Sequence, residues 1–521
     1  MPSPSRSVLW VDDEAELLEP HRLFLRERGF EVEMATNAAD AVEMLRRRPF
    51  DLLLLDEQMP GARGLAVVRE LRELAPGLPV VMVTKSEADD TLREAIGADV
   101  REYLLKPVNP RQVLAAVTRI LEGPLLRRQA FGREFVERFR AVESEDTRAF
   151  TWREWADRYA ELVQWDVDLA RANEPGLLES LRGLYPAMHR DFASYIATHY
   201  PGWLSDLSGD RPPLSVDVVA EFLLPLLSRS RAALFVVIDC LRLDQWKVIE
   251  PVLQEWFDIE TAHCYAVLPT ATPYARNALF SGLFPSELAE RHPDWVIDRD
   301  DESLNAHDRE LLELHLAELR GPTHVRYAKI TSAEDSAELV KHAASAVATD
   351  GVSAFVFNFI DLLTHGRSES TILREMARDD TALRELTEQW FRHSSALAVL
   401  KEAARKRIPV IVTSDHGSVH CNTPATVFAK RDATLSLRFK FGENIRAERP
   451  ELALMFPDEA MLRLPRRGPA PGNVLLATSD TFFVYPTKLR EYQQRYRGAY
   501  LHGGISPEEM ILPVSLLTPR G

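Results

Sequence analysis

Six side chains between residues 239 and 502 are of the types that bind divalent metal ions. They are three aspartates and three histidines: Asp239, Asp361, His365, Asp415, His416 and His502. Carboxylate and imidazole ligands without a thiolate suit Zn²⁺, with Mn²⁺ as a second choice. The glycines after His502 allow a close approach of the backbone. The sequence therefore predicts a centre for divalent metal ions.

A hydroxyl group that could act as a nucleophile lies between the first two aspartates. Residues 268–277 have the pattern of a loop that leads into a helix, which predicts Thr272 at the N-cap and Pro273 at the first helical position. The N-terminus of a helix attracts phosphate through its unpaired N–H groups and its dipole. Metal coordination lowers the pKa of a hydroxyl group, so Thr272 could attack a phosphorus atom at neutral pH.

Four further residues are candidates for substrate binding. Arg276 and Asn277 lie one helical turn beyond Thr272 and are either phosphate donors or residues with a helix-capping and surface role. Lys440 and Asn444 could also help to hold a substrate. Residues 285–350 and 421–500 separate the blocks of metal ligands, and we expect them to form caps over the site.

A second acidic group lies near the N-terminus. Asp12, Asp13 and Asp56 would repel one another unless a hard cation such as Mg²⁺ neutralised them. Thr84 and Lys106 would supply a hydroxyl donor and a positive charge for phosphoryl oxygens. This group predicts a magnesium-dependent phosphoryl site.

Short apolar runs precede most of these residues, which predicts buried parallel strands. The runs are residues 7–11, 51–55, 80–83, 102–105, 233–238, 352–360 and 408–413. In an open α/β sheet, ligands gather at the carboxyl edge of the strands. We therefore expect two α/β domains, each with its own group of acidic residues at one sheet edge.

The segment between these domains has a helical pattern. Apolar residues recur at helical spacing, as at Trp152, Trp155, Tyr159, Leu162 and Val163. Breaks at residues 174–176 and 200–202 predict roughly three or four helices in a small bundle, with the tryptophans in its core. No basic recognition helix stands out in this segment, so it is not expected to read DNA. The functional output of the chain must therefore lie in the residues that follow it.

Composition further narrows the possible functions and cellular compartments of the protein. A formal net charge of −16 over 521 residues argues against sequence-independent DNA binding. Cys240, Cys264 and Cys421 are scattered without a CxxC pair, so we expect no disulfide framework and a reducing cytoplasm. The N-terminus lacks an apolar signal segment and the apolar runs are too short to cross a bilayer, so neither export nor membrane anchoring is expected.

Residues 5–121 resemble the response-regulator receiver family, which has a flavodoxin-like fold. The resemblance implies an acidic pair at Asp12 and Asp13, a phosphate acceptor at Asp56 and a bound Mg²⁺. It also implies a switch residue at Thr84, an aromatic switch partner at Tyr103, and the lysine of the family motif at Lys106, directly before Pro107. A sensor histidine kinase is the partner that such a domain implies.

Residues 211–521 resemble the alkaline-phosphatase superfamily in its PglZ branch. The resemblance rests on the order of the ligands and on the stretches DCLRLDQW (239–246) and TATPYARNALFSG (270–282). It implies two zinc ions, one held by Asp361, His365 and His502. The other would be held by Asp239, Asp415 and His416 beside Thr272, which would itself contact the metal. A carboxylate set for a third metal is not identified, which mildly favours phosphodiesters over monoesters.

The whole chain resembles PorX-type response regulators. This implies a receiver at residues 1–122, a helical linker at 123–210 and a PglZ domain at 211–521. It also implies a zinc-dependent phosphodiesterase acting on linear or cyclic oligonucleotides, dimerisation on phosphorylation of Asp56, a link to type IX secretion, and an extracytoplasmic-function sigma factor as partner.

Two functions stay open. The first is an enzyme controlled by phosphorylation, which we favour because all six ligands and Thr272 are present. The second is a signalling adaptor, whose metal-bound fold binds a sigma factor or secretion component without essential catalysis.

Overall fold

The structure is a computed structural model. It describes the chain except residues 1–5, 60–61, 64–67, 69–70, 72–73, 76, 85–99, 208, 296–304, 368–369, 429–435, 487–488 and 521. The chain divides into two compact units, residues 1–142 and 143–521. Within the described residues, no helix is both long enough and apolar enough to span a membrane.

The first unit is built on a five-stranded parallel sheet in the order β2-β1-β3-β6-β7. Its strands are β1 (Arg6–Val11), β2 (Phe30–Ala35), β3 (Leu52–Asp56), β6 (Val80–Thr84) and β7 (Glu102–Leu105), and a short hairpin joins β4 (Gln58–Met59) to β5 (Ala62–Arg63). Helices α1 (Glu19–Arg26) and α5 (Pro110–Leu121) pack on the face that contains Trp10, and α2 (Ala38–Arg47) packs on the face that contains Leu9. This is the flavodoxin-like arrangement that the apolar runs predict.

Helices connect this sheet to the second unit and begin that unit. They are α6 (Gly123–Glu143), α7 (Trp152–Arg171), α8 (Pro175–Arg182) and α9 (Tyr185–Ser205). Trp155 and Trp203 are buried, as core residues should be, and Trp155 packs edge-on against Phe192. The Tyr265 hydroxyl donates to the Trp152 carbonyl at 2.7 Å, so these helices pack directly on the effector.

The second unit is built on a six-stranded sheet in the order β10-β11-β8-β12-β21-β9. Its strands are β8 (Ala232–Ile238), β9 (Phe257–Tyr265), β10 (Val325–Ile330), β11 (Gly351–Phe357), β12 (Val410–Thr413) and β21 (Ile511–Pro519). The first four in spatial order are parallel, whereas β21 runs antiparallel to both of its neighbours. The carboxyl ends of β11, β8 and β12 therefore meet at one edge.

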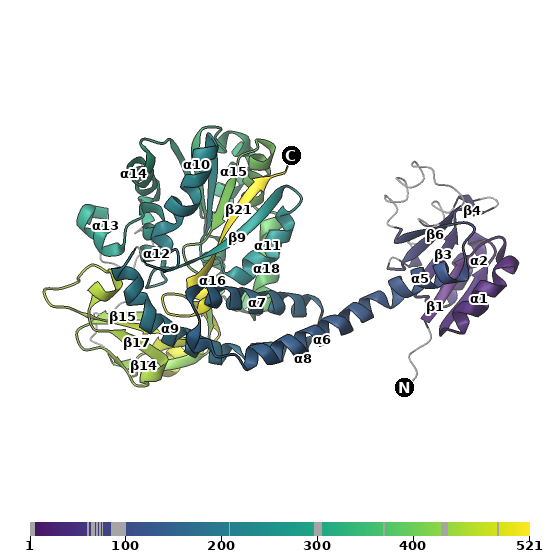
Figure 1. The fold of residues 1–521 in the computed structure, drawn as a ribbon, viewed down its shortest axis with the longest axis horizontal. Helices are drawn as coiled ribbons and strands as arrows, with labels where there is room; N and C mark the ends of the chain where they lie inside the picture. The colour runs from purple at the N-terminus through teal and green to yellow at the C-terminus, as the bar shows by residue number, and fades with distance from the viewer. Residues whose placement is uncertain are drawn as a thin grey trace. The chain divides into compact units, whose positions relative to one another are not determined.

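Helices cover both faces of this sheet (Figure 1). One face packs against α10 (Leu224–Arg229), α12 (Thr272–Ser281) and α14 (Asp308–Arg320), together with the π-helical turn Val219–Leu223. The remaining helices are α11 (Leu243–Leu253), α13 (Pro285–Arg291), α15 (Ala333–Ala346), α16 (Phe359–Arg367), α17 (Thr371–Met376), α18 (Asp380–Arg392), α19 (Ser395–Arg405), α20 (Leu489–Tyr496) and α21 (Pro507–Met510).

Among the described residues of the second unit, three small sheets lie outside the central one. The first pairs β13 (Val419–Cys421) with β20 (Ala499–Leu501); the second has the order β16 (Arg446–Ala447), β14 (Thr423–Phe428), β19 (Thr481–Val484); the third has the order β15 (Phe439–Gly442), β18 (Asn473–Ala477), β17 (Ala453–Phe456). The predicted second cap thus corresponds to these sheets. The first predicted cap, residues 285–350, is wrong in part, because β10 from this segment is the edge strand of the central sheet.

A further local prediction is wrong. The predicted break at residues 200–202 lies inside α9, where Pro201 is tolerated. The buried Tyr200 hydroxyl accepts from the Leu268 backbone N–H at 2.9 Å, and Trp203 packs against Tyr265. These tertiary contacts offset the cost of proline in a helix, which is about 3 kcal/mol.

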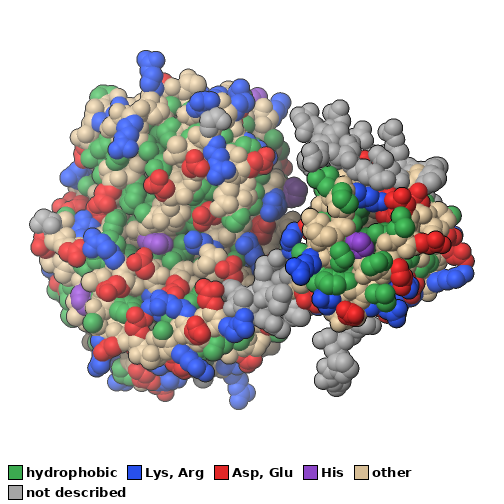
Figure 2. All heavy atoms as spheres, turned by 45° about the vertical axis from the view of Figure 1, so that its right-hand side comes forward, with side chains coloured by type: hydrophobic (Ala, Val, Ile, Leu, Met, Phe, Trp, Pro, Cys, Tyr) green, Lys and Arg blue, Asp and Glu red, His purple; other side chains and the backbone are tan. Residues whose placement is uncertain are grey.

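All three cysteines, Cys240, Cys264 and Cys421, are buried and unpaired. On the face shown in Figure 2, acidic and basic side chains of the described residues are interspersed over the larger unit.

Candidate functional site

The acidic group of the first unit forms a pocket at the carboxyl edge of β1 and β3. Carboxylate oxygens of Asp12, Asp13 and Asp56 lie within 4.8 Å of one another, and Asp12 and Asp56 are buried. Lys106 Nζ lies 2.8 Å from Asp12 Oδ2 and 2.8 Å from Asp56 Oδ2, so it neutralises part of the negative charge. This arrangement suits a hard cation with oxygen ligands.

The two switch candidates of this pocket differ in their partners. The Thr84 hydroxyl, at the end of β6, donates to Glu57 beside Asp56. Burial, followed by the charge of Glu57, raises the pKa of Tyr103. Five of the predicted receiver residues lie at or just beyond the carboxyl ends of β1, β3, β6 and β7, and Tyr103 lies within β7, which pairs with β6.

In the second unit, the metal-ligand candidates gather at the edge where β8, β11 and β12 end. Asp239 directly follows β8, and Asp415 and His416 follow β12. Asp361 was expected at the end of a strand, but β11 ends at Phe357 and Asp361 lies in the first turn of α16. Helical spacing then places His365 one turn further along the same helix.

The six candidates form two groups of three. Asp361, His365 and His502 make one group, and Asp239, Asp415 and His416 make the other; within each group the ligand atoms lie within 4.8 Å of one another. The rings of His416 and His502 stack with centroids 4.3 Å apart, so the two groups adjoin. The two sets of ligands that the family resemblance implies have the same membership.

Thr272 lies beside the second group. Its Oγ1 is 2.9 Å from His416 Nε2, while His416 Nδ1 is 3.0 Å from the Gly417 carbonyl oxygen. A carbonyl oxygen can only accept a hydrogen bond, so Nδ1 carries a hydrogen atom and, in the neutral imidazole, Nε2 carries the lone pair. The predicted N-cap is wrong by one residue: Ala271 caps α12, and Thr272 is its first residue. The hydroxyl nevertheless stays at the helix N-terminus.

Arg276 is a counter-ion of the second group. It is fully buried, and it contacts the carboxylates of Asp239 and Asp415, the latter at 3.0 Å. Its alternative interpretation as a surface residue is therefore wrong. Burial raises the pKa of Asp239 well above its ordinary value despite the opposing charge of Arg276, with Asp415 and Asp361 adding to the rise. Burial also opposes ionisation of Asp415, but Arg276 holds its pKa below the usual range.

Electrostatics in the first group favour an unprotonated His502. Burial and the neighbouring His416 and His365 lower the pKa of His502 to about 3. Burial would raise the pKa of Asp361, but the imidazole of His365 outweighs it and holds that pKa low. His365 is exposed whereas Asp361 is buried, so the group opens toward solvent on the His365 side.

The donor set fits divalent metal ions. Asp239 Oδ1 is buried and makes no hydrogen bond to any residue that the structure describes. His365 Nε2 and His502 Nε2 lie 3.2 Å apart, which places two imidazole nitrogens around one position. Burying a carboxylate oxygen costs folding free energy unless the oxygen is hydrogen-bonded, paired with a cation or bound to a metal ion. Carboxylate and imidazole donors of this kind suit Zn²⁺.

The other substrate candidates are not all brought to the site. Asn277 is buried; its amide donates to the Pro273 carbonyl at 3.0 Å, and its side-chain oxygen accepts from Asn305. Lys440 is buried with its ammonium 5.0 Å from the centroid of the Tyr485 ring, while the flanking Phe439 and Phe441 contact Tyr274.

Strand alternation thus turns Lys440 away from Tyr274 and from α12. Asn444 lies in the exposed turn after β15. The predicted substrate roles of these two residues therefore gain no support from their positions.

Three residues that the sequence did not single out also support the site. The Asn358 amide donates to Asp239 Oδ2 at 2.8 Å, and the Thr270 carbonyl lies 3.3 Å from His502 Nδ1. Cys240 adopts a positive φ of 64°, which turns the chain so that its N–H reaches Asp415 Oδ1 at 3.3 Å. No local sequence pattern marks Asn358, but a residue after a ligand-bearing strand is a reasonable candidate for such support.

Comparisons with known families match the three parts of the chain. The response regulator receiver domain matches residues 8–118, the PorX response regulator linker domain matches residues 126–204, and the BREX system PglZ alkaline phosphatase-like domain matches residues 218–516. Fold and matches define a response regulator with an alkaline-phosphatase-like effector. The chain belongs to the PglZ family, with a receiver and a PorX linker domain before the PglZ domain. The expected resemblance to PorX-type response regulators is confirmed.

Curated relatives match only part of the chain. The alginate biosynthesis transcriptional regulatory protein AlgB of Pseudomonas putida is 40% identical over 115 residues, which is 22% of this chain and 26% of AlgB. The sensory transduction protein RegX3 of Mycobacterium bovis is 37% identical over 117 residues, 22% of this chain and 50% of RegX3. The chain thus spans about a quarter of the length of AlgB and half that of RegX3.

Solved structures match over a similar share. A CheY-like receiver domain protein from Methanospirillum hungatei is 29% identical and covers 23% of this chain and 94% of its own, with a TM-score of 0.22.

Proposed function

We propose that the effector is a zinc-dependent phosphodiesterase that acts on linear or cyclic oligonucleotides and is controlled by phosphorylation of Asp56. The observation that carries the proposal is the position of Thr272. Its hydroxyl lies at a helix N-terminus, 2.9 Å from His416 Nε2, beside two adjoining groups of three ligands. A nucleophile, a phosphate-binding helix end and two metal sites are the parts that phosphoester cleavage needs.

The residues have separable roles in this proposal. Asp361, His365 and His502 would hold one zinc ion, and Asp239, Asp415 and His416 would hold the other. The bound ions would supply Lewis acidity and lower the pKa of the Thr272 hydroxyl. Thr272 would then attack the phosphorus atom, losing its hydroxyl proton to solvent and forming a P–O bond while the P–O bond to the departing alcohol breaks and that alcohol takes up a proton. Water would then hydrolyse the phosphothreonine and restore the Thr272 hydroxyl. The first N–H groups of α12 would face the phosphate oxygens. Arg276 balances the charge of Asp239 and Asp415, and we do not assign it to the substrate.

Control by the receiver is the second part of the proposal. Phosphorylation adds about −1.5 to −2 charges at Asp56, and Lys106 and Thr84 are placed to meet them. We infer that this favours a homodimer. Type IX secretion and an extracytoplasmic-function sigma factor are the process and the partner that PorX-type relatives suggest. A cytoplasmic location agrees with three unpaired cysteines.

Metal content and cleavage by the full-length protein test the proposal. We expect about two zinc ions per chain, cleavage of bis(p-nitrophenyl) phosphate in preference to p-nitrophenyl phosphate, and cleavage within a panel of linear and cyclic oligonucleotides. A protein that binds no divalent metal, or a metal-loaded protein that cleaves no phosphoester, would contradict it. Full downstream signalling by metal-bound Thr272→Ala would favour the adaptor function instead.

A further inference from the structure

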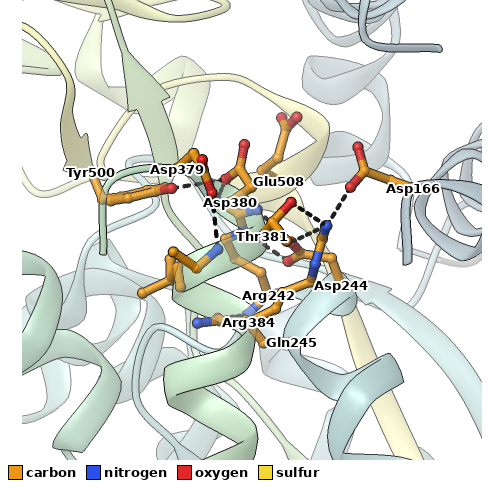
Figure 3. A network of polar contacts seen from close by, with 12 residues as sticks. Asp166, Arg242, Asp244, Gln245, Asp379, Asp380, Thr381, Arg384, Tyr500 and Glu508 are labelled. Atoms are coloured by element: carbon orange, nitrogen blue, oxygen red, sulfur yellow. Dashed lines mark hydrogen bonds and ion pairs between the residues drawn. The ribbon is translucent and has the colours of Figure 1, made fainter. Parts of the chain in front are cut away.

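A continuous series of five charged side chains and one tyrosine joins linker helix α7 to the loops that carry the metal-ligand candidates (Figure 3). In order, its members are Asp166, Arg384, Asp244, Arg242, Asp380 and Tyr500, and we call them the Asp166–Tyr500 series. The first four are each at most 4% exposed. Their contacts are therefore shielded from solvent along most of the series.

The linker end of the series is Asp166. Its carboxylate accepts two hydrogen bonds from Arg182 of α8, at 3.0 and 3.2 Å, and also contacts the guanidinium of Arg384. Arg384 lies on α18, and its other terminal nitrogen, Nη1, is 3.3 Å from Asp244 Oδ2. One arginine thus binds a carboxylate of the linker and a carboxylate of the effector at the same time.

The middle of the series is Arg242, three residues after Asp239. It donates to both oxygens of Asp244, at 2.8 and 2.6 Å, and lies 2.8 Å from Asp380. A Cβ atom built on Gly417 would lie 3.2 Å from Arg242 Cγ, so the side chain of Arg242 packs against the residue that follows His416. Arg242 therefore contacts both loops that supply the second group of ligands.

The far end of the series is Tyr500, two residues before His502. Its hydroxyl donates to Asp380 at 3.1 Å, and the guanidinium groups of Arg242 and Arg367 lie 5.5 and 5.1 Å from its ring centroid. Arg367 is two residues after His365. The ring is therefore held by residues adjacent to ligands of both groups.

The burial of so many charged groups needs an explanation. Desolvation of buried ion pairs commonly cancels their attraction, so apolar residues of similar size would stabilise the fold to about the same extent. A buried series of charged groups does, however, define the geometry of its members, because each side chain has one set of partners. Removing one side chain leaves its neighbour as an uncompensated buried charge. Residues that hold metal ligands from behind typically change metal affinity 10- to 100-fold when they are replaced.

We propose that the Asp166–Tyr500 series is a positioning device that fixes the two groups of metal ligands relative to each other, and that the linker helices act on the site through Asp166. The inference rests on the proposed metal centre. Asp166 and Arg384 touch no ligand and are positioning residues, acting through Arg242 and Tyr500. Movement of α7 would change the partners of Arg384, and hence of Asp244 and Arg242.

Cobalt substitution of the full-length protein tests this inference, because the visible absorption of Co²⁺ reports its ligand geometry directly. The variants are Asp166→Asn, Asp166→Glu, Arg384→Lys and Tyr500→Phe. The matched control is Asp168→Asn, on the same helix, whose carboxylate accepts from Gln164 at 3.1 Å. Co²⁺ affinity is measured by competition with a chelator, and folding by the midpoint of thermal unfolding.

We expect Asp166→Asn to shift the Co²⁺ bands and to weaken Co²⁺ binding by about tenfold or more, with Asp166→Glu restoring much of both. Tyr500→Phe keeps the ring between the two arginines and should have a smaller effect. Asp168→Asn should match the wild type. If Asp166→Asn does not fold, Arg384→Lys, which keeps the charge, decides the question by the same two readouts.

Two results would be negative in different ways. Wild-type protein that binds fewer than two Co²⁺ ions, with excess Mg²⁺ present to occupy the pocket at Asp12, Asp13 and Asp56, would overturn the proposed metal centre itself. Wild-type protein that binds two, with bands and affinity unchanged in folded Asp166→Asn and Arg384→Lys, would overturn the positioning device and leave the metal centre standing.

Discussion

The hydroxyl of Thr272 and the Nε2 atom of His416 lie 2.9 Å apart, and the other nitrogen of His416 is engaged by the Gly417 carbonyl. The same lone pair on Nε2 can therefore accept the Thr272 proton or bind a metal ion, but not both. In the proposed enzyme, metal binding to His416 releases the Thr272 hydroxyl from this hydrogen bond. The nucleophile and the metal site are thus linked through one nitrogen atom.

Replacement of Thr272 separates the two functions of this site. Thr272→Ala should lower phosphodiester cleavage by roughly 10³-fold or more because it removes the nucleophile. It should keep the metal content of the wild type, because the six other ligands remain, and Thr272→Ser should retain substantial activity. Cleavage rates and metal analysis on the same preparations check both statements. Undiminished cleavage by Thr272→Ala would exclude Thr272 as the nucleophile.

Gly417 tests how tightly the loop after β12 is packed. A Cβ atom at this position would lie 1.9 Å from the Glu508 carbonyl oxygen, so Gly417→Ala must displace backbone next to His416. We expect a loss of about 1–3 kcal/mol of stability and weaker binding at the second metal site. At Gly468 nothing lies within 4 Å of the added atom, so Gly468→Ala should be neutral within about 0.5 kcal/mol. Equal stability of the two variants, from denaturant unfolding, would contradict this packing.

His263, on β9, predicts an acid sensitivity. Burial lowers the pKa of its imidazole to about 4, below its ordinary value of about 6.5. Above pH 6.5 the group is neutral in both states and contributes nothing. As the pH falls from 6.5 to 4, the unfolded chain takes up the proton and the folded chain does not, so stability is lost, up to about 3 kcal/mol.

His263→Gln removes this titration. Its thermal midpoint should therefore fall less than that of the wild type between pH 7 and pH 4, whatever the difference between them at pH 7. Parallel pH profiles would show that His263 is protonated in the folded protein.

Asp56 predicts a response to a phosphoryl mimic. Beryllofluoride with Mg²⁺ should convert the wild type to a dimer in sedimentation, because Lys106 and Thr84 reorganise around the new negative group. Asp56→Asn should not respond. A wild type that stays monomeric at micromolar concentration would rule out this form of control.

Much of the site could be predicted because its ligands follow apolar strands. Burial makes β8 and β12 continuous apolar runs, so the acids at Asp239 and Asp415 are visible in the sequence. Strand β10 was missed because it is an edge strand, in which Arg326 and Lys329 interrupt the apolar pattern. The fold class was confirmed, whereas the ends of individual elements, as at Thr272 and Asp361, depend on single backbone conformations.

The support behind the ligands could not be predicted. Asp166 and Arg384 are 218 positions apart, and Arg182 and Arg384 carry no local mark that distinguishes them from surface arginines. The same holds for Arg276, whose place at a helix N-terminus suggested a phosphate ligand. Only the fold shows that its partners are Asp239 and Asp415.

The three buried cysteines have a practical consequence. Burial raises the pKa of each thiol, so none should react with alkylating reagents while the chain stays folded around it. Cys240 lies in the loop after Asp239, Cys264 in β9 and Cys421 in β13. The rate at which each thiol becomes labelled would therefore report the opening of three separate places in the effector, without any introduced probe.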